Sequence, residues 1–250
     1  MKQRYFIELS FRGTNYSGWQ IQKNGNSVQA EVNHALSTIL QEEIKTMGAG
    51  RTDKGVHAEK YIAHFDTSKT VIKNHIFKLN QFLPKDIAVR EIYFSESTIH
   101  ARFDAISRSY KYCISHKKNP FGDGMSFLNW TNYDIKKMNT AAALLLKHKE
   151  FQSFSKSKSD LHHFQCKISY AKWKKEGSMD VFYITSNRFL RGMVRAITGT
   201  LIKVGNNKLK INDFNNIILS KNIINAGPLV PAHGLFFTGV EYPFNLTPIR

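Results

Sequence analysis

The sequence predicts an α+β protein built from two βαββαβ halves, and three observations support this. Apolar and polar side chains alternate over residues 5–11, as expected for a strand whose two faces differ. Apolar residues at helical spacing follow that strand, and two further strand-like runs come after them. The same order of elements then recurs in the second part of the 250-residue chain. Each half therefore has the element order of a ferredoxin-like unit, with a mainly antiparallel sheet.

In the first half, the strand over residues 5–11 is followed by a helix that Ser27 can cap, because its hydroxyl can accept a backbone N–H. The apolar stripe of that helix consists of Val28, Val32, Ala35, Leu36, Ile39 and Leu40. The other expected elements of this half are strands over residues 44–49 and 61–65, a helix over 71–83 that ends at Pro84, and a strand over 87–94.

The second half repeats this order, with an extra helical segment before its last strand. Its expected elements are strands over residues 105–115, 166–174, 181–186 and 235–241, and helices over 134–146, 189–204 and 211–219. We place the domain boundary near Ala105, which gives domains of residues 1–105 and 106–250. Since the two halves do not visibly align in sequence, the repeat depends on element order. Two sheets side by side would leave an active-site cleft between them.

The charge of the chain indicates a polyanionic partner. Lys and Arg number 36 against 19 Asp and Glu, which gives a net charge of +17 and a pI near 9.8. Nucleic acid is the leading partner. A membrane-surface role is disfavoured because the chain has no concentrated polybasic tail or lipidation motif. No apolar run approaches the ~20 residues of a spanning helix, and the N-terminus does not resemble a signal peptide, so we expect a cytoplasmic protein.

A metal site is not expected. Cys113 and Cys166 are far apart and have no Cys-x-x-Cys spacing, and no fourth ligand lies near His162, His163 and Cys166. Two long polar connections, residues 116–132 and 150–164, are expected either to contact an RNA backbone or to be solvated loops.

The loop of residues 50–58, with the sequence Gly-Arg-Thr-Asp-Lys-Gly-Val-His-Ala, is the first candidate for chemistry. It lies between two expected strands, and it places the Asp53 carboxylate between Arg51 and Gly55. Gly50 and Gly55 would permit a bulky substrate to approach closely. The alternative is an ordinary turn, since Asp commonly hydrogen-bonds its own backbone in turns.

The segment of residues 187–199 is the second candidate. If the helix starts near Phe189, then Arg188, Arg191 and Arg195 share one face at spacings of three and four. Such a face contacts phosphate groups or solvent. Arg195 differs from the other two because it borders the apolar stripe, where its guanidinium could pair with a carboxylate.

Two residues of the second half, Tyr110 and Leu235, have patterns that by themselves predict core packing. Tyr110 alternates with apolar residues along an expected strand, and Leu235 follows Gly234 at the start of the last strand.

Several motifs together resemble the tRNA pseudouridine synthase A family. They are the string of residues 50–58, the opening Gly-Thr-Asn-Tyr-Ser-Gly-Trp-Gln of residues 13–20, Ala-Arg-Phe at 101–103 with Arg-Ser-Tyr-Lys-Tyr at 108–112, the arginine-containing string of residues 187–199, and Gly-Leu-Phe at 234–236. Lys54 occupies the variable place of the first motif. Gly192 is a departure, because the family usually has a bulkier polar residue there.

The resemblance implies isomerisation of uridine to pseudouridine at positions 38, 39 and 40 of the tRNA anticodon arm, without a cofactor. It implies that Asp53 is the essential carboxylate, Arg195 its ion-pair partner and Tyr110 the group that stacks on the target base. Leu235 would form an apolar wall of the base pocket, and Arg51 would help to hold the flipped nucleotide. A homodimer that binds tRNA is also implied.

Two other functions compete with this interpretation. A catalytically inactive RNA-binding or RNA-folding protein would have the same charge and fold, but the presence of Asp53, Tyr110 and Arg195 disfavours it. A nucleoside hydrolase that uses Asp53 is disfavoured because no second carboxylate lies near a motif.

Overall fold

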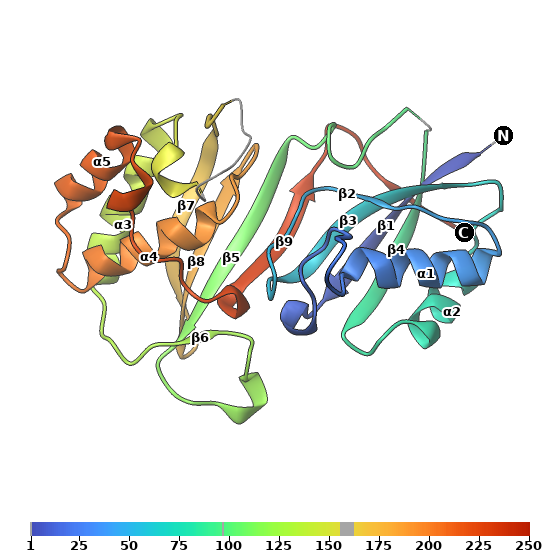
Figure 1. Ribbon diagram of the computed structural model, residues 1–250, viewed down its shortest axis with the longest axis horizontal. Coiled ribbons are helices and arrows are strands. Elements are labelled where there is room, and N and C mark those ends of the chain that lie inside the picture. Colours follow the sequence, from blue (N-terminus) through green and yellow to red (C-terminus); the bar gives the residue numbers. More distant parts are fainter. Residues whose placement is uncertain (1, 97, 156–162) are drawn as a thin grey trace. The chain divides into compact units, whose positions relative to one another are not determined.

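The computed structural model describes residues 2–96, 98–155 and 163–250 (Figure 1). The chain forms two compact units, which we describe separately. The first consists of Met1–Ile106 and Phe237–Arg250, and the second of Ser107–Phe236. Strand β9 (Leu235–Glu241) therefore begins in the second unit and ends in the first.

The first unit has the predicted order of strands and helices. Its elements are β1 (Gln3–Phe11), α1 (Val28–Leu40), β2 (Met47–Gly48), β3 (His57–Thr67), α2 (Asn74–Phe82), β4 (Ile87–Ser95) and the short β10 (Thr247–Pro248). The strands β10, β4, β1 and β3 are neighbours in that order and pair antiparallel, and β2 pairs with β3. Helices α1 and α2 lie on one face of this sheet (Figure 1).

Helix α1 begins where the sequence predicts, because the Ser27 hydroxyl accepts the N–H of Ala30 at 3.3 Å. The strand expected over residues 44–49 is shorter than predicted and is limited to β2. The physical reason is that side chains of α1 accept hydrogen bonds from the backbone before β2, so these N–H groups do not pair with a neighbouring strand. The Ser37 hydroxyl accepts from the N–H of Ile44, and the Asn33 side chain accepts from the N–H of Thr46. Helix α2 also starts later than predicted, at Asn74.

Both faces of the first sheet are buried. Tyr5, Ile7 and Leu9 are at most 2% exposed on one face, as their alternation predicts. Phe6, on the other face, is also fully buried. It belongs to a cluster with Ala49, Ile62 and Ala101, and the hydrophobic residues packed against this cluster are Tyr93, Ile99, Val240, Tyr242, Phe244 and Leu246. The chain returns to the first unit after the second one, and this return covers the second face.

The burial of His64 on β3 predicts that the stability of the protein depends on pH. Burial lowers its pKa to about 4, and the positive charges of Arg4 and His100 add to this effect while Asp66 opposes it. Between about pH 6.5 and 4 the unfolded chain binds the proton and the folded one does not, so we expect the free energy of unfolding to fall as pH falls through this range. The loss at the acid end should be up to about 3 kcal/mol.

Urea unfolding measured from neutral pH to about pH 4 tests this, because His64→Gln should flatten the dependence relative to the wild type. His34→Gln, at an exposed position of α1, is the control and should keep the wild-type dependence. Equal slopes for wild type and His64→Gln would show that His64 is not the group responsible.

The second unit contains β5 (Ser107–Ser115), β6 (Phe127–Leu128), α3 (Ile135–Leu144), β7 (Ile168–Glu176), β8 (Met179–Ser186), α4 (Met193–Gly205) and α5 (Ile211–Ser220). Strands β5, β8 and β7 pair antiparallel in that order, and the short β6 pairs parallel with β5. Helix α3 packs on β7 and also contacts α4 and α5. The protein is therefore α+β with largely antiparallel strands, as predicted.

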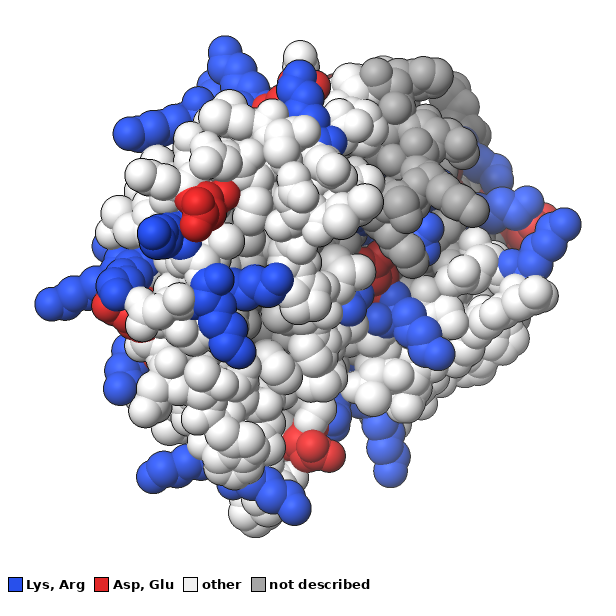
Figure 2. Space-filling view, turned by 60° about the vertical axis from the view of Figure 1, so that its left-hand side comes forward, with Lys and Arg blue, Asp and Glu red and all other residues white. Residues whose placement is uncertain are grey.

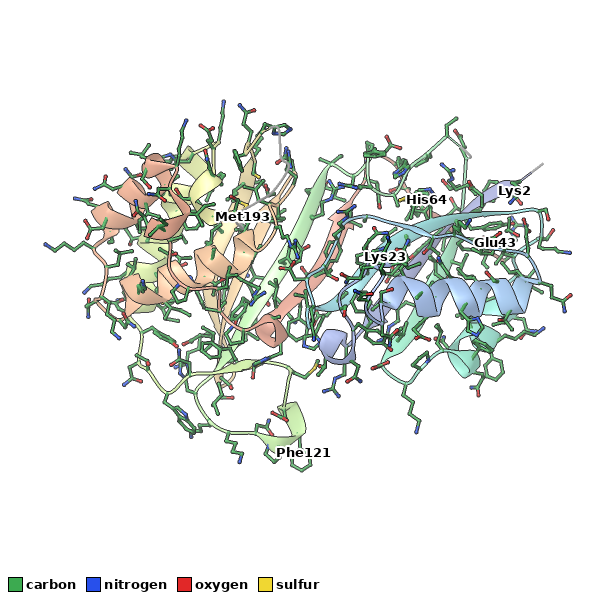
Figure 3. The ribbon with its side chains drawn as sticks, in the orientation of Figure 1. Lys2, Lys23, Glu43, His64, Phe121 and Met193 are labelled. Atoms are coloured by element: carbon green, nitrogen blue, oxygen red, sulfur yellow. The ribbon has the colours of Figure 1, made fainter. Side chains whose placement is uncertain are left out.

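Short 3₁₀ helices occupy several connections. They span Gly13–Asn15, Pro120–Gly122, Leu145–Lys147, Gln152–Phe154, Ile223–Asn225 and Ala232–Gly234. The predicted polar connection over residues 116–132 contains the 3₁₀ helix Pro120–Gly122 as well as β6. Phe121 of this 3₁₀ helix projects outward (Figure 3). Of the other predicted connection, residues 156–162 lie outside the described residues, and these include His162.

The helix predicted over residues 189–204 starts four residues later, at Met193. Gly192 precedes it with φ +73°, a left-handed conformation that interrupts a right-handed helix. Arg188 and Arg191 therefore precede α4, and the prediction that they share a helix face with Arg195 was wrong. Within α4, Gly199 permits close packing, because an added Cβ would lie 2.0 Å from the Pro228 carbonyl oxygen.

Candidate active site

The loop that carries Asp53 connects β2 to β3 in the first unit. Asp53 is half-buried, whereas Arg51 and Lys54 on either side of it are exposed. The Asp53 carbonyl accepts the N–H of Val56 at 3.2 Å, and Gly55 has φ +80°. The loop thus contains a tight turn that requires glycine, and its backbone bonds do not depend on the Asp53 side chain.

Residues 13–19, which we call the clasp, hold this loop through its backbone and side chains. The N–H of Gly13 donates to His57 Nδ1 at 3.0 Å, and the N–H of Gly55 donates to the Tyr16 carbonyl at 3.2 Å. The N–H of Trp19 donates to the Thr52 hydroxyl at 3.0 Å. The loop is therefore bonded to the clasp on both sides of Asp53.

Two glycines allow the clasp to approach so closely. A Cβ on Gly13 would lie 1.9 Å from the Val56 carbonyl oxygen, and a Cβ on Gly18 would lie 2.2 Å from that of Thr52. Gly18 also has φ +100°, which L side chains rarely adopt. Any larger residue at either position would push against the backbone of the Asp53 loop.

The clasp is in turn anchored to Asp86, just before β4. The Tyr16 hydroxyl donates to one oxygen of the Asp86 carboxylate at 2.6 Å, and the Asn15 amide donates to the other at 3.0 Å. The N–H of Arg12 donates to the Asp86 carbonyl at 2.9 Å. Burial, followed by the hydrogen bond to Asp86, raises the pKa of Tyr16 above its usual range, so this tyrosine stays a donor.

The positioning roles of Tyr16, His57 and Asp86 were not predicted from the sequence. The strings Gly-Thr-Asn-Tyr-Ser-Gly-Trp and Gly-Val-His contain two of these residues, and their paired glycines were the signal that could have indicated close backbone contacts. Asp86 has no such local signal, because its bonds to Asn15 and Tyr16 join residues that are 71 and 70 positions apart.

Tyr110 lies on β5 of the second unit, opposite Ile184 of β8. It is 9% exposed, and its ring meets the Phe189 ring edge-on, with centroids 5.2 Å apart and an interplanar angle of 87°. Phe189 belongs to the segment between β8 and α4. This segment therefore fixes the orientation of the tyrosine ring.

Arg195 lies in the first turn of α4, and its Nε donates to the Val230 carbonyl at 2.7 Å. Its charge lies near Tyr112, where it opposes the increase in pKa that burial causes for this phenol. The Tyr112 hydroxyl donates to the neighbouring Pro231 carbonyl at 2.9 Å. The segment around Val230 is thus fixed to β5, and in turn it fixes the guanidinium of Arg195.

The remaining candidates of the second unit lie outside α4. Leu235 is 5% exposed at the start of β9. Arg188 is half-buried, with Nη1 3.0 Å from the ring nitrogens of His163, whereas Arg191 is exposed. Arg51 and Asp53 therefore belong to the first unit, and the other candidates to the second. The expected pairing of Asp53 with Arg195 stays a prediction.

Basic side chains are spread over the face that Figure 2 shows, and acidic ones are sparse there.

In the described part of the chain, no three His, Cys, Asp or Glu side chains are grouped so that they could hold a metal ion. None of the helices that the structure describes is long and apolar enough to cross a membrane.

Comparison with known proteins shows the family. A profile described as tRNA pseudouridine synthase matches residues 141–243. The tRNA pseudouridine synthase A of Parabacteroides distasonis is 45% identical over 251 residues, which cover 99% of each chain. The protein of the same name from Azobacteroides pseudotrichonymphae is 46% identical, over 96% of this chain and 97% of its own. That of Syntrophomonas wolfei is 36% identical, over 96% of this chain and 98% of its own. The chain therefore belongs to the tRNA pseudouridine synthase A family.

Proposed function

We propose that this chain isomerises uridine to pseudouridine at positions 38, 39 and 40 of the tRNA anticodon arm. Family membership makes it an RNA pseudouridine synthase, and its relatives are named for tRNA. The observation that carries the choice of site is the Asp53 loop, whose half-buried carboxylate is held on both sides by the clasp. Catalytic side chains need such support from the surrounding structure.

The reaction needs a positioned carboxylate, a stacking group and a pocket that excludes water. The bond from C1′ to N1 of the uridine breaks, the uracil turns and C1′ joins C5. C5 then loses its proton, and N1 of the product carries one in place of its former bond to C1′. The atoms balance without a redox partner or cofactor. We consider three mechanisms, in which Asp53 attacks C1′, adds at C6 or abstracts the C2′ proton. All three require the ionised carboxylate.

The other candidates have supporting roles in this proposal. Arg195 pairs with Asp53 as its oppositely charged partner. Tyr110 stacks on the target base and is the candidate general base at C5, and Leu235 forms an apolar wall of the base pocket. Arg51 holds the flipped nucleotide outside the stem, because extrusion of a paired base costs a few kcal/mol.

The broader organisation expected from the sequence is also part of the proposal. It comprises two ferredoxin-like domains with the active-site cleft between them. The sequence places these domains at residues 1–105 and 106–250, and in the structure Phe237–Arg250 returns to the first unit. This organisation further includes a homodimer that binds tRNA in the cytoplasm. The element order of the first unit and the net charge of +17 are the observations that favour it.

The proposed phosphate contacts of Arg188 and Arg191 can be tested by salt dependence. We expect Arg191→Ala to weaken tRNA binding and to reduce the slope of log affinity against log salt by about one. Arg188→Ala should behave similarly, although its proximity to His163 makes Arg191 the cleaner choice. Arg191→Lys is the matched control, since it keeps the charge and should keep the slope. A slope that is unchanged in Arg191→Ala would assign this residue to the solvated surface.

Tritium release from C5-labelled uridine in unmodified tRNA tests the activity itself. The purified protein should release tritium without any added cofactor. A protein that binds tRNA tightly but releases none would instead be the RNA-binding protein considered above, which the charge alone would also explain.

A further inference from the structure

The turn between β4 and β5 presents an aromatic ring to solvent. Phe103 is 75% exposed, whereas the neighbouring Ala101 is fully buried in the core cluster of the first unit. Single exposed aromatic residues are common on protein surfaces, and Phe103 is distinguished from them by how its ring and backbone are held.

The backbone of this turn is closely fixed. His100 Nδ1 accepts the N–H groups of Arg102 and Phe103 at 3.0 and 3.3 Å, and the N–H of His100 donates to the Asp104 carboxylate at 2.7 Å. Because Nδ1 accepts two hydrogen bonds, it carries no proton. The His100 ring therefore braces the two residues that follow it.

A second set of bonds attaches the turn to the sheet. His64 Nδ1 accepts the N–H of Ala101 at 3.0 Å, and the Tyr242 hydroxyl donates to the Ala101 carbonyl at 2.7 Å. Arg4 Nη1 donates to the Ile99 carbonyl at 2.8 Å. In Figure 3, His64 is labelled on the strand that supports this turn. Phe103 thus projects from a rigid base, unlike the aromatic residues of a loose loop.

The rings of Phe103, His100 and His64 also contact one another in that order. The Phe103 and His100 ring centroids are 4.3 Å apart at 33°, and those of His100 and His64 are 4.6 Å apart at 72°. The Arg102 guanidinium carbon lies 5.7 Å from the Phe103 centroid. We call Phe103, His100 and Arg102 the aromatic platform. It combines an exposed π surface, a rigid backing and a cation.

We propose that the aromatic platform stacks on an unpaired base of the bound RNA, while Arg102 attracts the adjacent phosphate. The inference rests on the proposed function for its partner, since a tRNA substrate has unpaired bases in its loops. Stacking on aromatic side chains is how proteins bind unpaired bases, and a nearby Arg adds charge. The net charge of +17 favours this anionic partner over an apolar protein surface.

The test compares tRNA binding by Phe103→Ala, Phe103→Trp and the wild type at one salt concentration. Phe103→Ala should weaken binding by about 5- to 150-fold, and Phe103→Trp should restore it, because the indole also stacks. The matched control is Phe77→Ala on α2, which removes a ring that is 64% exposed in the same unit and should change binding less than twofold. Since Phe103 is exposed, thermal unfolding of its variants should match the wild type.

Ultraviolet crosslinking of unmodified tRNA, followed by peptide mapping, gives a direct readout. The wild type should yield a crosslinked peptide that contains Phe103. If neither the crosslink nor the loss of affinity is found in a protein that forms pseudouridine, the aromatic platform does not bind RNA and the proposed function stands. If both are found in a protein without activity, the platform is supported and the proposed function fails. A lower oligomer mass for Phe103→Ala in light scattering, without a crosslink, would overturn the inference in favour of contact with a second copy.

Discussion

Replacement of Asp53 by Asn is expected to lower pseudouridine formation by at least about 10³-fold while tRNA binding stays close to that of the wild type. The substituted amide has nearly the same shape but no negative charge, so it can neither attack carbon nor take up a proton. The fold should persist, because the bond from the Val56 N–H to the carbonyl of residue 53 involves only the backbone. Tritium release and equilibrium binding of the same tRNA, under identical salt, measure the two properties separately.

Lys54→Gln is the matched control for this experiment. Lys54 is the exposed neighbour of Asp53 in the same loop, and its replacement removes a charge without touching the carboxylate. It should retain most of the activity. If Asp53→Asn kept a tenth or more of the wild-type rate, Asp53 could not be the essential group, whatever the behaviour of Lys54→Gln.

Gly18→Ala is expected to have the second-largest effect, because it acts on the positioning of the whole Asp53 loop. The new Cβ would lie 2.2 Å from the Thr52 carbonyl oxygen, and the backbone at this position has φ +100°. Strain and overpacking together should lower the free energy of unfolding by about 2–6 kcal/mol. The loop must also shift, so the activity of the molecules that remain folded should fall.

Gly50→Ala provides a stability control in the same loop. No atom lies within 4 Å of a Cβ built on Gly50, so its urea midpoint should stay near that of the wild type. Unfolding in urea ranks the variants, and tritium release below the unfolding transition reports the position of Asp53. A Gly18→Ala protein with wild-type stability and rate would show that the clasp does not hold the loop.

Much of the fold follows from signals within a few residues along the chain. Ser27 and the apolar stripe behind it were sufficient to predict where α1 begins, and the strand predicted over residues 235–241 is confirmed as β9 (Leu235–Glu241). The predictions of a strand over all of residues 44–49 and of a helix that begins at residue 189 were wrong. In those places side chains of α1 and the left-handed Gly192 determine the backbone conformation.

The sequence by itself also determined the basic character of the protein, its family and the candidate carboxylate, because net charge follows from composition and motifs follow from residue order. Only the tertiary structure decided what supports that carboxylate. The bonds from Gly13 to His57 and from Trp19 to Thr52 join residues 44 and 33 positions apart, and the bond from Tyr16 to Asp86 joins residues 70 apart. Local periodicity contains no information about such contacts, since they form only when the sheet brings distant segments together.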